Sequence, residues 1–372
     1  MKILFFSPYF YPYTSGITTY PFLVFSHLAK QNEVTVLTFP HIKELPKEEH
    51  IDNMTIVRLP YSFKISKGFI SPQSLYFFFK YLQKSDIVFL NIPNFEGIFL
   101  AILAKILKKR IISIYHCEVK LNSGFFNSII EYLLSIAVLM QLLLSDTIIG
   151  YTKDYVMDKA NGRRFKNKFV FTLPPVPSLP YTKTNHDSKK FTLGFAGRIA
   201  QEKGLEFLID AASTLQKEGV NLELIFAGPL GKEVAGEEQY YKKIHSLLDH
   251  KKLKFTFLGT LKNKDFGNFY KSVDILVLPS VNKTEAFGMV QVEAMLAGTP
   301  VIASDLPGVR VPITLTKMGL IVEPKDVGGL ADAIKEIKTN YSKYTNEELV
   351  KKAHEVFDID KTFKLYDKLI RL

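Results

Sequence analysis

Cysteine is almost absent from this sequence, with Cys117 the single one among 372 residues. One cysteine cannot form an internal disulfide, so the sequence excludes a disulfide-stapled fold and favours a reducing, cytoplasmic compartment. The sequence also lacks the ligand spacing of zinc sites, nucleic-acid-binding motifs, internal repeats and low-complexity tails. We therefore expect a globular protein with no metal site and no nucleic-acid partner.

Long apolar runs are missing too. The uncharged stretch from Tyr132 to Ser145 is about 14 residues long, whereas a membrane-spanning helix needs roughly 18 or more. The region from Phe125 to Leu144 therefore predicts a buried or interfacial helix and not a transmembrane one. The N-terminus has one lysine and a short apolar run without a small-residue cleavage site, so we do not expect a signal peptide.

The charge balance is basic: 48 Lys and Arg against 37 Asp and Glu give a formal net charge of +11. An excess of positive charge favours anionic partners, either phosphorylated substrates or an anionic lipid surface. The length suits two domains better than one, because single cores stop growing beyond about 250–300 residues. The segment from Leu173 to Lys190 is rich in proline and polar residues and predicts an interdomain linker.

The stretch from Val273 to Arg310 carries the densest pattern in the chain. It predicts a buried strand, a polar loop with Glu285, a helix starting after Phe287 and Gly288, and a second buried strand. Such βαβ units build parallel sheets, which bind ligands beyond the carboxyl ends of their strands. The first helical amides, at Met289 and Val290, suit an anion or sugar hydroxyls.

Two acidic residues of this stretch, Glu285 in the loop and Glu293 in the helix, can face the same crevice. The alternative is one helix-terminal and one solvated glutamate, and spacing alone does not decide between them.

A second motif, GRIAQEKG, places Arg198 and Lys203 between a strand and a helix start. Like charge opposes the helix dipole there, and a bound anion would resolve the conflict, although two solvated loop cations are the simpler interpretation.

These motifs together resemble a known enzyme family. The pattern E-x-F-G-x-x-x-x-E-A-x-x-x-G-x-P-V-I-A-S, with G-R-x-x-x-x-K-G before it, is similar to that of the retaining, nucleotide-sugar-dependent glycosyltransferases of the group 1 type, family 4. The resemblance implies an α/β fold of the GT-B type, with two Rossmann-like domains and parallel sheets facing each other across a cleft. It implies an N-terminal acceptor domain at 1–175, a donor domain at 186–351, and a final helix, about 352–372, that packs back on the first domain.

The resemblance also implies roles for single residues. Arg198 and Lys203 would grip the donor diphosphate, Glu285 the donor sugar and Glu293 the ribose. Further donor or acceptor contacts would come from His116, which ends a strand near the donor sugar, and from the backbone around a set of loop and helix-start residues: Gly16, Gly197, Gly228, Phe287, Gly288, Met289 and Val290. A lone histidine is more often structural, and many members carry Gly-Gly where this chain has Ser15-Gly16.

The predicted activity is transfer of a hexose-type sugar, with retention and without a metal, from a UDP- or GDP-sugar to a lipid-linked or glycan acceptor. No cofactor is expected, because the nucleoside diphosphate sugar is a co-substrate. The alternatives are a non-transferring nucleotide-sugar binder, an epimerase of the same fold, or a transferase acting on a small soluble acceptor. The helix expected near 95–110 ends in four cations (Lys105, Lys108, Lys109 and Arg110) and, with the apolar region 125–144, favours peripheral docking on the inner face of the cytoplasmic membrane.

Overall fold

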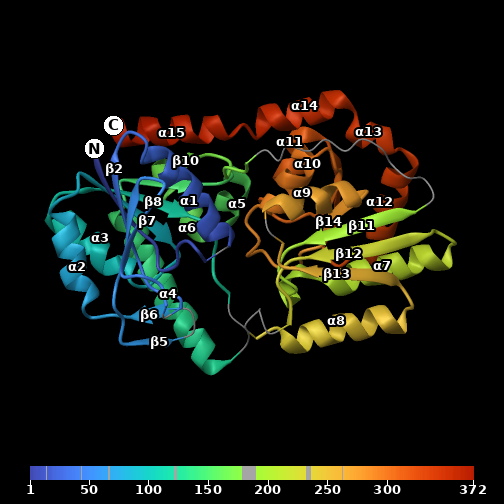
Figure 1. The fold of residues 1–372 in the computed structure, drawn as a ribbon, viewed down its shortest axis with the longest axis horizontal. Helices are drawn as coiled ribbons and strands as arrows, with labels where there is room; N and C mark the ends of the chain where they lie inside the picture. Colours follow the sequence, from blue (N-terminus) through green and yellow to red (C-terminus); the bar gives the residue numbers. More distant parts are fainter. Residues whose placement is uncertain are drawn as a thin grey trace. The chain divides into compact units, whose positions relative to one another are not determined.

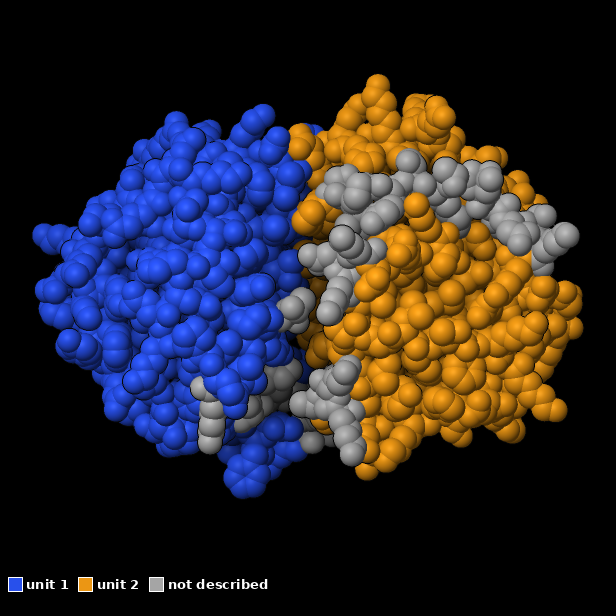
Figure 2. Space-filling model, viewed as in Figure 1, with its two compact units in different colours: residues 1–175, 359–372 blue, residues 176–358 orange. Residues whose placement is uncertain are grey.

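The computed structural model describes residues 1–13, 15–42, 44–65, 68–120, 124–177, 190–231, 236–261 and 263–372. They form two compact units, shown in different colours in Figure 2. Unit 1 is Met1–Pro175 with Ile359–Leu372, and unit 2 is Val176–Asp358. Each unit is a mainly parallel sheet with helices packed against it (Figure 1). Residues 178–189 of the predicted linker lie outside the described part.

Unit 1 is built on an eight-stranded sheet with the order β10-β9-β8-β7-β1-β2-β4-β3, parallel except where β3 meets β4. Its central strands are continuous apolar runs, and all six residues of β7 are buried, as expected for a strand covered on both faces. The strands are β1 (Lys2–Phe6), β2 (Glu33–Thr38), β3 (Glu48–Ile51), β4 (Met54–Arg58), β7 (Ile87–Ile92), β8 (Arg110–Tyr115), β9 (Thr147–Gly150) and β10 (Phe169–Phe171), beside a separate hairpin of β5 (Phe63–Ile65) and β6 (Gly68–Ile70).

The helices of unit 1 follow the strands as crossover connections. They are α1 (Gly16–Leu28), α2 (Ser74–Leu82), α3 (Gly97–Ile106), α4 (Phe125–Leu144), α5 (Lys153–Asp158), α6 (Ala160–Arg164), the short 3-10 turn η1 (Lys166–Lys168) and, from the end of the chain, α15 (Ile359–Arg371).

Helix α15 is fixed to unit 1 by a few specific contacts. The hydroxyl groups of Tyr20 in α1 and Tyr366 in α15 share a 2.6 Å hydrogen bond, and both side chains are fully buried. The hydroxyl of Thr362 donates to the Leu173 carbonyl at 2.8 Å. The ring of Phe363 stacks on His27 with centroids 4.2 Å apart. The C-terminal segment therefore completes the core of the unit that begins the chain.

Unit 2 is a six-stranded, fully parallel sheet with the order β13-β12-β11-β14-β15-β16. Its strands are β11 (Phe191–Ala196), β12 (Leu222–Ala227), β13 (Lys254–Gly259), β14 (Ile275–Leu278), β15 (Val301–Ser304) and β16 (Gly319–Val322). Its helices are η2 (Gln201–Lys203), α7 (Leu205–Lys217), α8 (Glu238–His250), α9 (Asn263–Ser272), α10 (Met289–Leu296), α11 (Val311–Thr316), α12 (Val327–Thr339), α13 (Tyr341–Thr345) and α14 (Glu347–Val356).

The C-terminal region differs from the sequence-based boundary. The helical pattern expected from about 352 onward is two helices, and α14 belongs to unit 2, where it packs on α10 and α11. Only α15, from Ile359, belongs to unit 1. The break falls at Phe357 and Asp358; the Phe357 side chain is buried against the ring of Phe287. Apolar residues continue at helical spacing through this junction, so the sequence pattern alone does not show that one helix ends and another begins.

The apolar helix α4 is longer than the uncharged stretch on which its sequence-based interpretation rested. The helix runs for 20 residues, and by length and composition alone it could cross a membrane, because the single charge of Glu131 does not interrupt it. Its second half packs into unit 1 through Ala137, Val138 and Leu142. Its first half extends past the sheet (Figure 1) and leaves Phe125 and Phe126 more than three-quarters exposed. The packed half, and not insufficient length, argues against a transmembrane assignment.

We predict that the Tyr20–Tyr366 hydrogen bond stabilises unit 1 measurably. Each single change to Phe leaves one buried hydroxyl without its partner, which costs about 1–3 kcal/mol. The double change removes both hydroxyl groups, so its loss should be clearly smaller than the sum of the two single losses. Urea unfolding of Tyr20→Phe, Tyr366→Phe and the double variant measures this, with the exposed Tyr76→Phe as control. Additive losses would show that the two hydroxyls do not interact.

Candidate functional site

Two glycines at strand ends bring the loops of unit 2 into direct backbone contact. Gly197 follows β11 and Gly228 follows β12, with φ angles of 143° and 134°. A Cβ on Gly228 would lie 2.1 Å from the Gly197 carbonyl oxygen, so a side chain there has no space. The Gly197 amide donates to the Ala227 carbonyl at 2.8 Å. The two predicted site glycines are thus adjacent, at the sheet edge where parallel α/β sheets bind ligands.

An ion pair joins the two sequence motifs. The Lys203 ammonium group donates to a carboxylate oxygen of Glu285, and the side chains are only 14% and 19% exposed. Burial raises the pKa of Glu285, but the Lys203 charge and hydrogen bond, the Arg198 charge and the Gly288 amide outweigh it, and the net shift is downward. The carboxylate therefore stays ionised well into the acidic range.

Arg198 occupies a more exposed place on the same loop. Its guanidinium donates to Glu202 at 2.8 Å, four residues further on, and its side chain is 50% exposed. The predicted pair of cations is therefore present at the strand-to-helix turn, and each cation has a carboxylate partner. Gly204, which ends the motif, has a φ of 63° and lies so close to the Pro279 carbonyl that a Cβ would approach it to 2.6 Å.

The start of α10 is held by a residue that sequence reasoning missed. The side-chain amide of Gln291 donates to the carbonyls of Phe287 and Val309, at 2.9 and 3.0 Å. Gly288 caps the helix with a φ of 75°, a conformation that favours glycine. The sequence signal that could have revealed Gln291 is a polar amide inside the mainly apolar run MVQVEAML. In the structure this side chain is fully buried.

Met289 and Val290 are the first two helical residues after Gly288, and the Phe287 ring is buried. Amides in the first turn have no acceptor within the helix. Glu293, one turn further on, accepts a 2.6 Å hydrogen bond from the Tyr270 hydroxyl. Burial raises the pKa of Glu293, and this bond offsets only part of the rise. Glu293 and Glu285 thus have different partners and opposite pKa shifts, and no sequence signal pointed to Tyr270.

The two remaining predicted residues belong to unit 1. His116 is buried at the end of β8, with one ring nitrogen bonded to the Tyr151 hydroxyl and the other to the Asn91 side chain. Burial lowers its pKa to about 3, so the ring is neutral at physiological pH. Asn91 also donates to the Ile17 carbonyl at 3.0 Å, which links His116 to the helix start at Gly16. Both ring nitrogens thus have partners inside the unit, and a site role for His116 stays a prediction.

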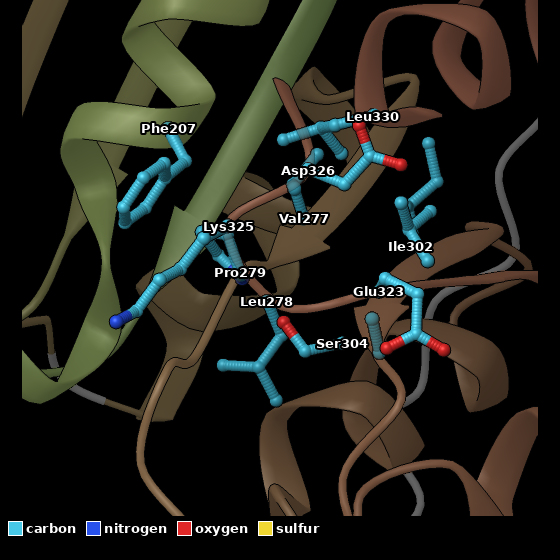
Figure 3. Close-up of a pocket in the computed structure, with 12 residues that line it drawn as sticks. Phe207, Val277, Leu278, Pro279, Ile302, Ser304, Glu323, Lys325, Asp326 and Leu330 are labelled. Carbon is cyan, nitrogen blue, oxygen red and sulfur yellow. The ribbon is translucent and has the colours of Figure 1, made fainter. Parts of the chain in front are cut away.

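A small cavity lies beside the unit 2 motifs, at the carboxyl ends of β14, β15 and β16. Figure 3 shows it between Phe207 of α7 and the side chains of Asp326, which caps α12, and Leu330 of α12. Its volume of about 10 Å³ holds no more than one water molecule. We attribute it to the packing of α7 and α12 on the sheet and not to a ligand.

Comparisons with known proteins agree with this arrangement. A family model for "Glycosyl transferases group 1" matches residues 182–356. An uncharacterised glycosyltransferase of Methanocaldococcus jannaschii is 31% identical over 188 residues, 46% of either chain. A D-inositol 3-phosphate glycosyltransferase of Mycolicibacterium smegmatis is 33% identical over 145 residues, which cover 39% of this chain and 32% of that protein. The matches thus span 46% and 32% of the lengths of these two relatives.

Solved structures show the fold along the whole chain. Anabaena HepE in complex with UDP-glucose matches with a TM-score of 0.79 and 17% identity, covering 100% of both chains. The fold is therefore the α/β GT-B fold expected from the motifs. The chain is thus similar to the group 1 glycosyl transferases over residues 182–356 and has the GT-B fold over its whole length.

Proposed function

We propose that the protein is a retaining glycosyltransferase that moves a hexose-type sugar from a UDP- or GDP-sugar to a lipid-linked or glycan acceptor in cell-surface polysaccharide or glycolipid synthesis. The observation that carries the proposal is the Lys203–Glu285 ion pair, which joins the two family motifs in one largely buried site. The match to the group 1 glycosyl transferase model and the UDP-glucose bound to HepE support a nucleotide-sugar donor. Thermal-shift and turnover screens of UDP- and GDP-sugars test the proposal, and stabilisation without turnover would favour a binder.

The chemistry follows from where charge develops. As the bond from the sugar to the diphosphate breaks, negative charge grows on the leaving phosphate oxygen. Arg198 and Lys203 are fixed cations that can stabilise it without a metal ion. Glu285, kept ionised by Lys203, can stabilise positive charge on the sugar ring and accept hydrogen bonds from its hydroxyl groups. Glu293 has Tyr270 on one oxygen and can accept ribose hydroxyls on the other.

The first prediction concerns the diphosphate contacts. Removing one preorganised charge costs about 2–4 kcal/mol of transition-state stabilisation. Arg198→Ala and Lys203→Ala should therefore each lower kcat/KM roughly a hundredfold or more, while Lys242→Ala, an exposed cation of α8 in the same unit, should have no effect. Turnover should survive EDTA. Activity within a few-fold of wild type in both variants, or its loss in EDTA, would contradict these roles.

A second prediction separates the glutamates by binding and by pH. Glu285→Gln should lower turnover while UDP or GDP still binds, whereas Glu293→Gln should weaken nucleotide binding. Because the pKa of Glu293 is raised above its ordinary 4.5, wild-type affinity should fall as pH decreases through that raised pKa, where the carboxylate becomes protonated. Calorimetry across acidic pH measures both effects. Loss of nucleotide binding in Glu285→Gln alone would reverse the two assignments.

We also propose that unit 1 docks peripherally on an anionic membrane from the cytoplasmic side. The support is the exposed apolar half of α4 and the net charge of +11. The four cations near α3 contribute less than their number suggests. Lys105 pairs with Asp146 at 2.5 Å, Lys109 donates to the Ser85 carbonyl and Arg110 to the Leu369 carbonyl. The inserted side chains, with Phe125 and Phe126 foremost, would therefore provide most of the binding.

Liposome co-sedimentation tests this docking. The wild-type protein should pellet with anionic vesicles and less at high salt, because exposed basic residues contribute about 1 kcal/mol each near such a surface. The double variant Phe125→Ser/Phe126→Ser should stay in the supernatant. Leu258→Ser/Leu315→Ser, which removes exposed apolar side chains from unit 2, is the matched control and should pellet normally. Equal recovery of the wild-type protein in the supernatant with neutral and anionic vesicles would favour a soluble acceptor.

A further inference from the structure

Unit 1 contains a pocket that none of the predicted site residues lines. It has a volume of about 440 Å³, within the range of small-molecule sites. It lies beyond the carboxyl ends of β7 and β8, where Pro93 and Tyr115 line it, and the projecting half of α4 forms its wall. Strand ends of this kind are the usual ligand position in parallel sheets.

One polar group that lines the pocket is the buried hydroxyl of Tyr115. The Tyr115 side chain is 1% exposed, and its hydroxyl has no hydrogen-bond partner among the described residues. The neighbouring Tyr155 hydroxyl, in contrast, accepts from the Glu118 amide at 3.0 Å. A buried hydroxyl without a partner is destabilising by about 1–3 kcal/mol. A ligand hydroxyl in the pocket would supply the missing hydrogen bond.

The charges around the pocket select against anions. The carboxylates of Glu118 and Glu131 line it, and no lysine or arginine does so among the described residues. Lys159, the cation that pairs with Glu118 at 3.9 Å, also lies 3.2 Å from Asp158, so its charge is already matched. Carboxylates accept hydrogen bonds from hydroxyl groups and repel phosphate.

The α4 residues that line the pocket add hydroxyl groups and an aromatic ring. Ser128 and Ser135 offer hydroxyl groups, and Tyr132, which is 67% exposed, offers an aromatic face at the rim. An aromatic ring beside hydroxyl groups and carboxylates suits a sugar, which has both hydroxyls and an apolar C–H face. The same helix presents its apolar residues to solvent beyond the rim.

We propose that this pocket is an acceptor subsite for an uncharged, hydroxyl-rich group, a neutral sugar or polyol at the reacting end of the acceptor. The inference rests on the proposed transferase function and narrows its acceptor class. The name of the D-inositol 3-phosphate glycosyltransferase implies that the acceptor ring of that relative carries a phosphate. The acceptor group proposed here carries none.

Ligand-observed NMR on the full chain, with UDP or GDP present, tests the subsite. The probes are the methyl glycosides of glucose, galactose and mannose, with glucose 6-phosphate as the charged counterpart. At least one neutral glycoside should bind tenfold or more tightly than glucose 6-phosphate. Tyr115→Phe should weaken that binding about fivefold to tenfold and leave nucleotide affinity unchanged. Tyr76→Phe on α2, exposed and outside the pocket, is the control.

Glu131→Lys provides a test that does not depend on the buried tyrosine. Glu131 lies on the projecting half of α4, so the change should leave the fold intact, as circular dichroism would verify. It should reverse the preference and bring glucose 6-phosphate to at least the affinity of the glycosides. Equal binding of both probe types by wild type, or no binding of any glycoside while the nucleotide binds, would overturn the subsite but not the transferase. Loss of nucleotide binding in wild type would instead refute the proposed function.

Discussion

The Lys203–Glu285 ion pair is the interaction on which the unit 2 site depends. It connects the loop after β11 to the loop after β14, two neighbouring strands that the chain places about eighty residues apart. Removing one partner would leave a largely buried charge without compensation, which is far more destabilising than loss of an exposed pair. The pair also keeps Glu285 ionised against the effect of burial. A single contact thus positions two motifs and sets the charge of one of them.

Close backbone packing completes that arrangement. Gly228 lies against the Gly197 carbonyl, and Gly204 lies against the Pro279 carbonyl, at distances that exclude a Cβ. Gln291 performs a comparable role from a side chain, because its amide donates to the Phe287 carbonyl before α10 and to the Val309 carbonyl before α11. The loops are consequently held by their backbone, and their charged side chains extend from fixed positions. Such preorganisation is what electrostatic stabilisation of a leaving group requires.

The sequence predicted the strands of unit 2 more reliably than the side-chain partners in the loops between them. Apolar runs and glycine turns mark β11, β14 and α10 directly, because local patterning determines them. The bonds from Tyr270 to Glu293 and from Gln291 to Val309 join residues 18 or more positions apart, and one sequence contains no record of such pairs. In unit 1 the apolar pattern of Ile51–Pro60 predicts one strand region, but the chain turns at Asp52 and Asn53, both with positive φ, so that Ile51 ends β3 and Met54 begins β4. Likewise, the aromatic-rich stretch 68–84 predicts a helix from its sequence, but α2 begins only at Ser74, because Gly68–Ile70 pairs with β5.

The two units differ in the charge that they offer a ligand. The unit 2 site combines cations with a carboxylate, which suits a molecule with a diphosphate at one end and hydroxyl groups at the other. The unit 1 pocket has carboxylates and a hydroxyl without a partner in the described part of the chain, which suit hydroxyl groups alone. A second phosphate group would be repelled there, because the carboxylates of Glu118 and Glu131 line the pocket together with Tyr115. The division of charge therefore favours a donor that carries the phosphates and an acceptor that enters unit 1 by its neutral end, with any apolar portion left to the exposed face of α4.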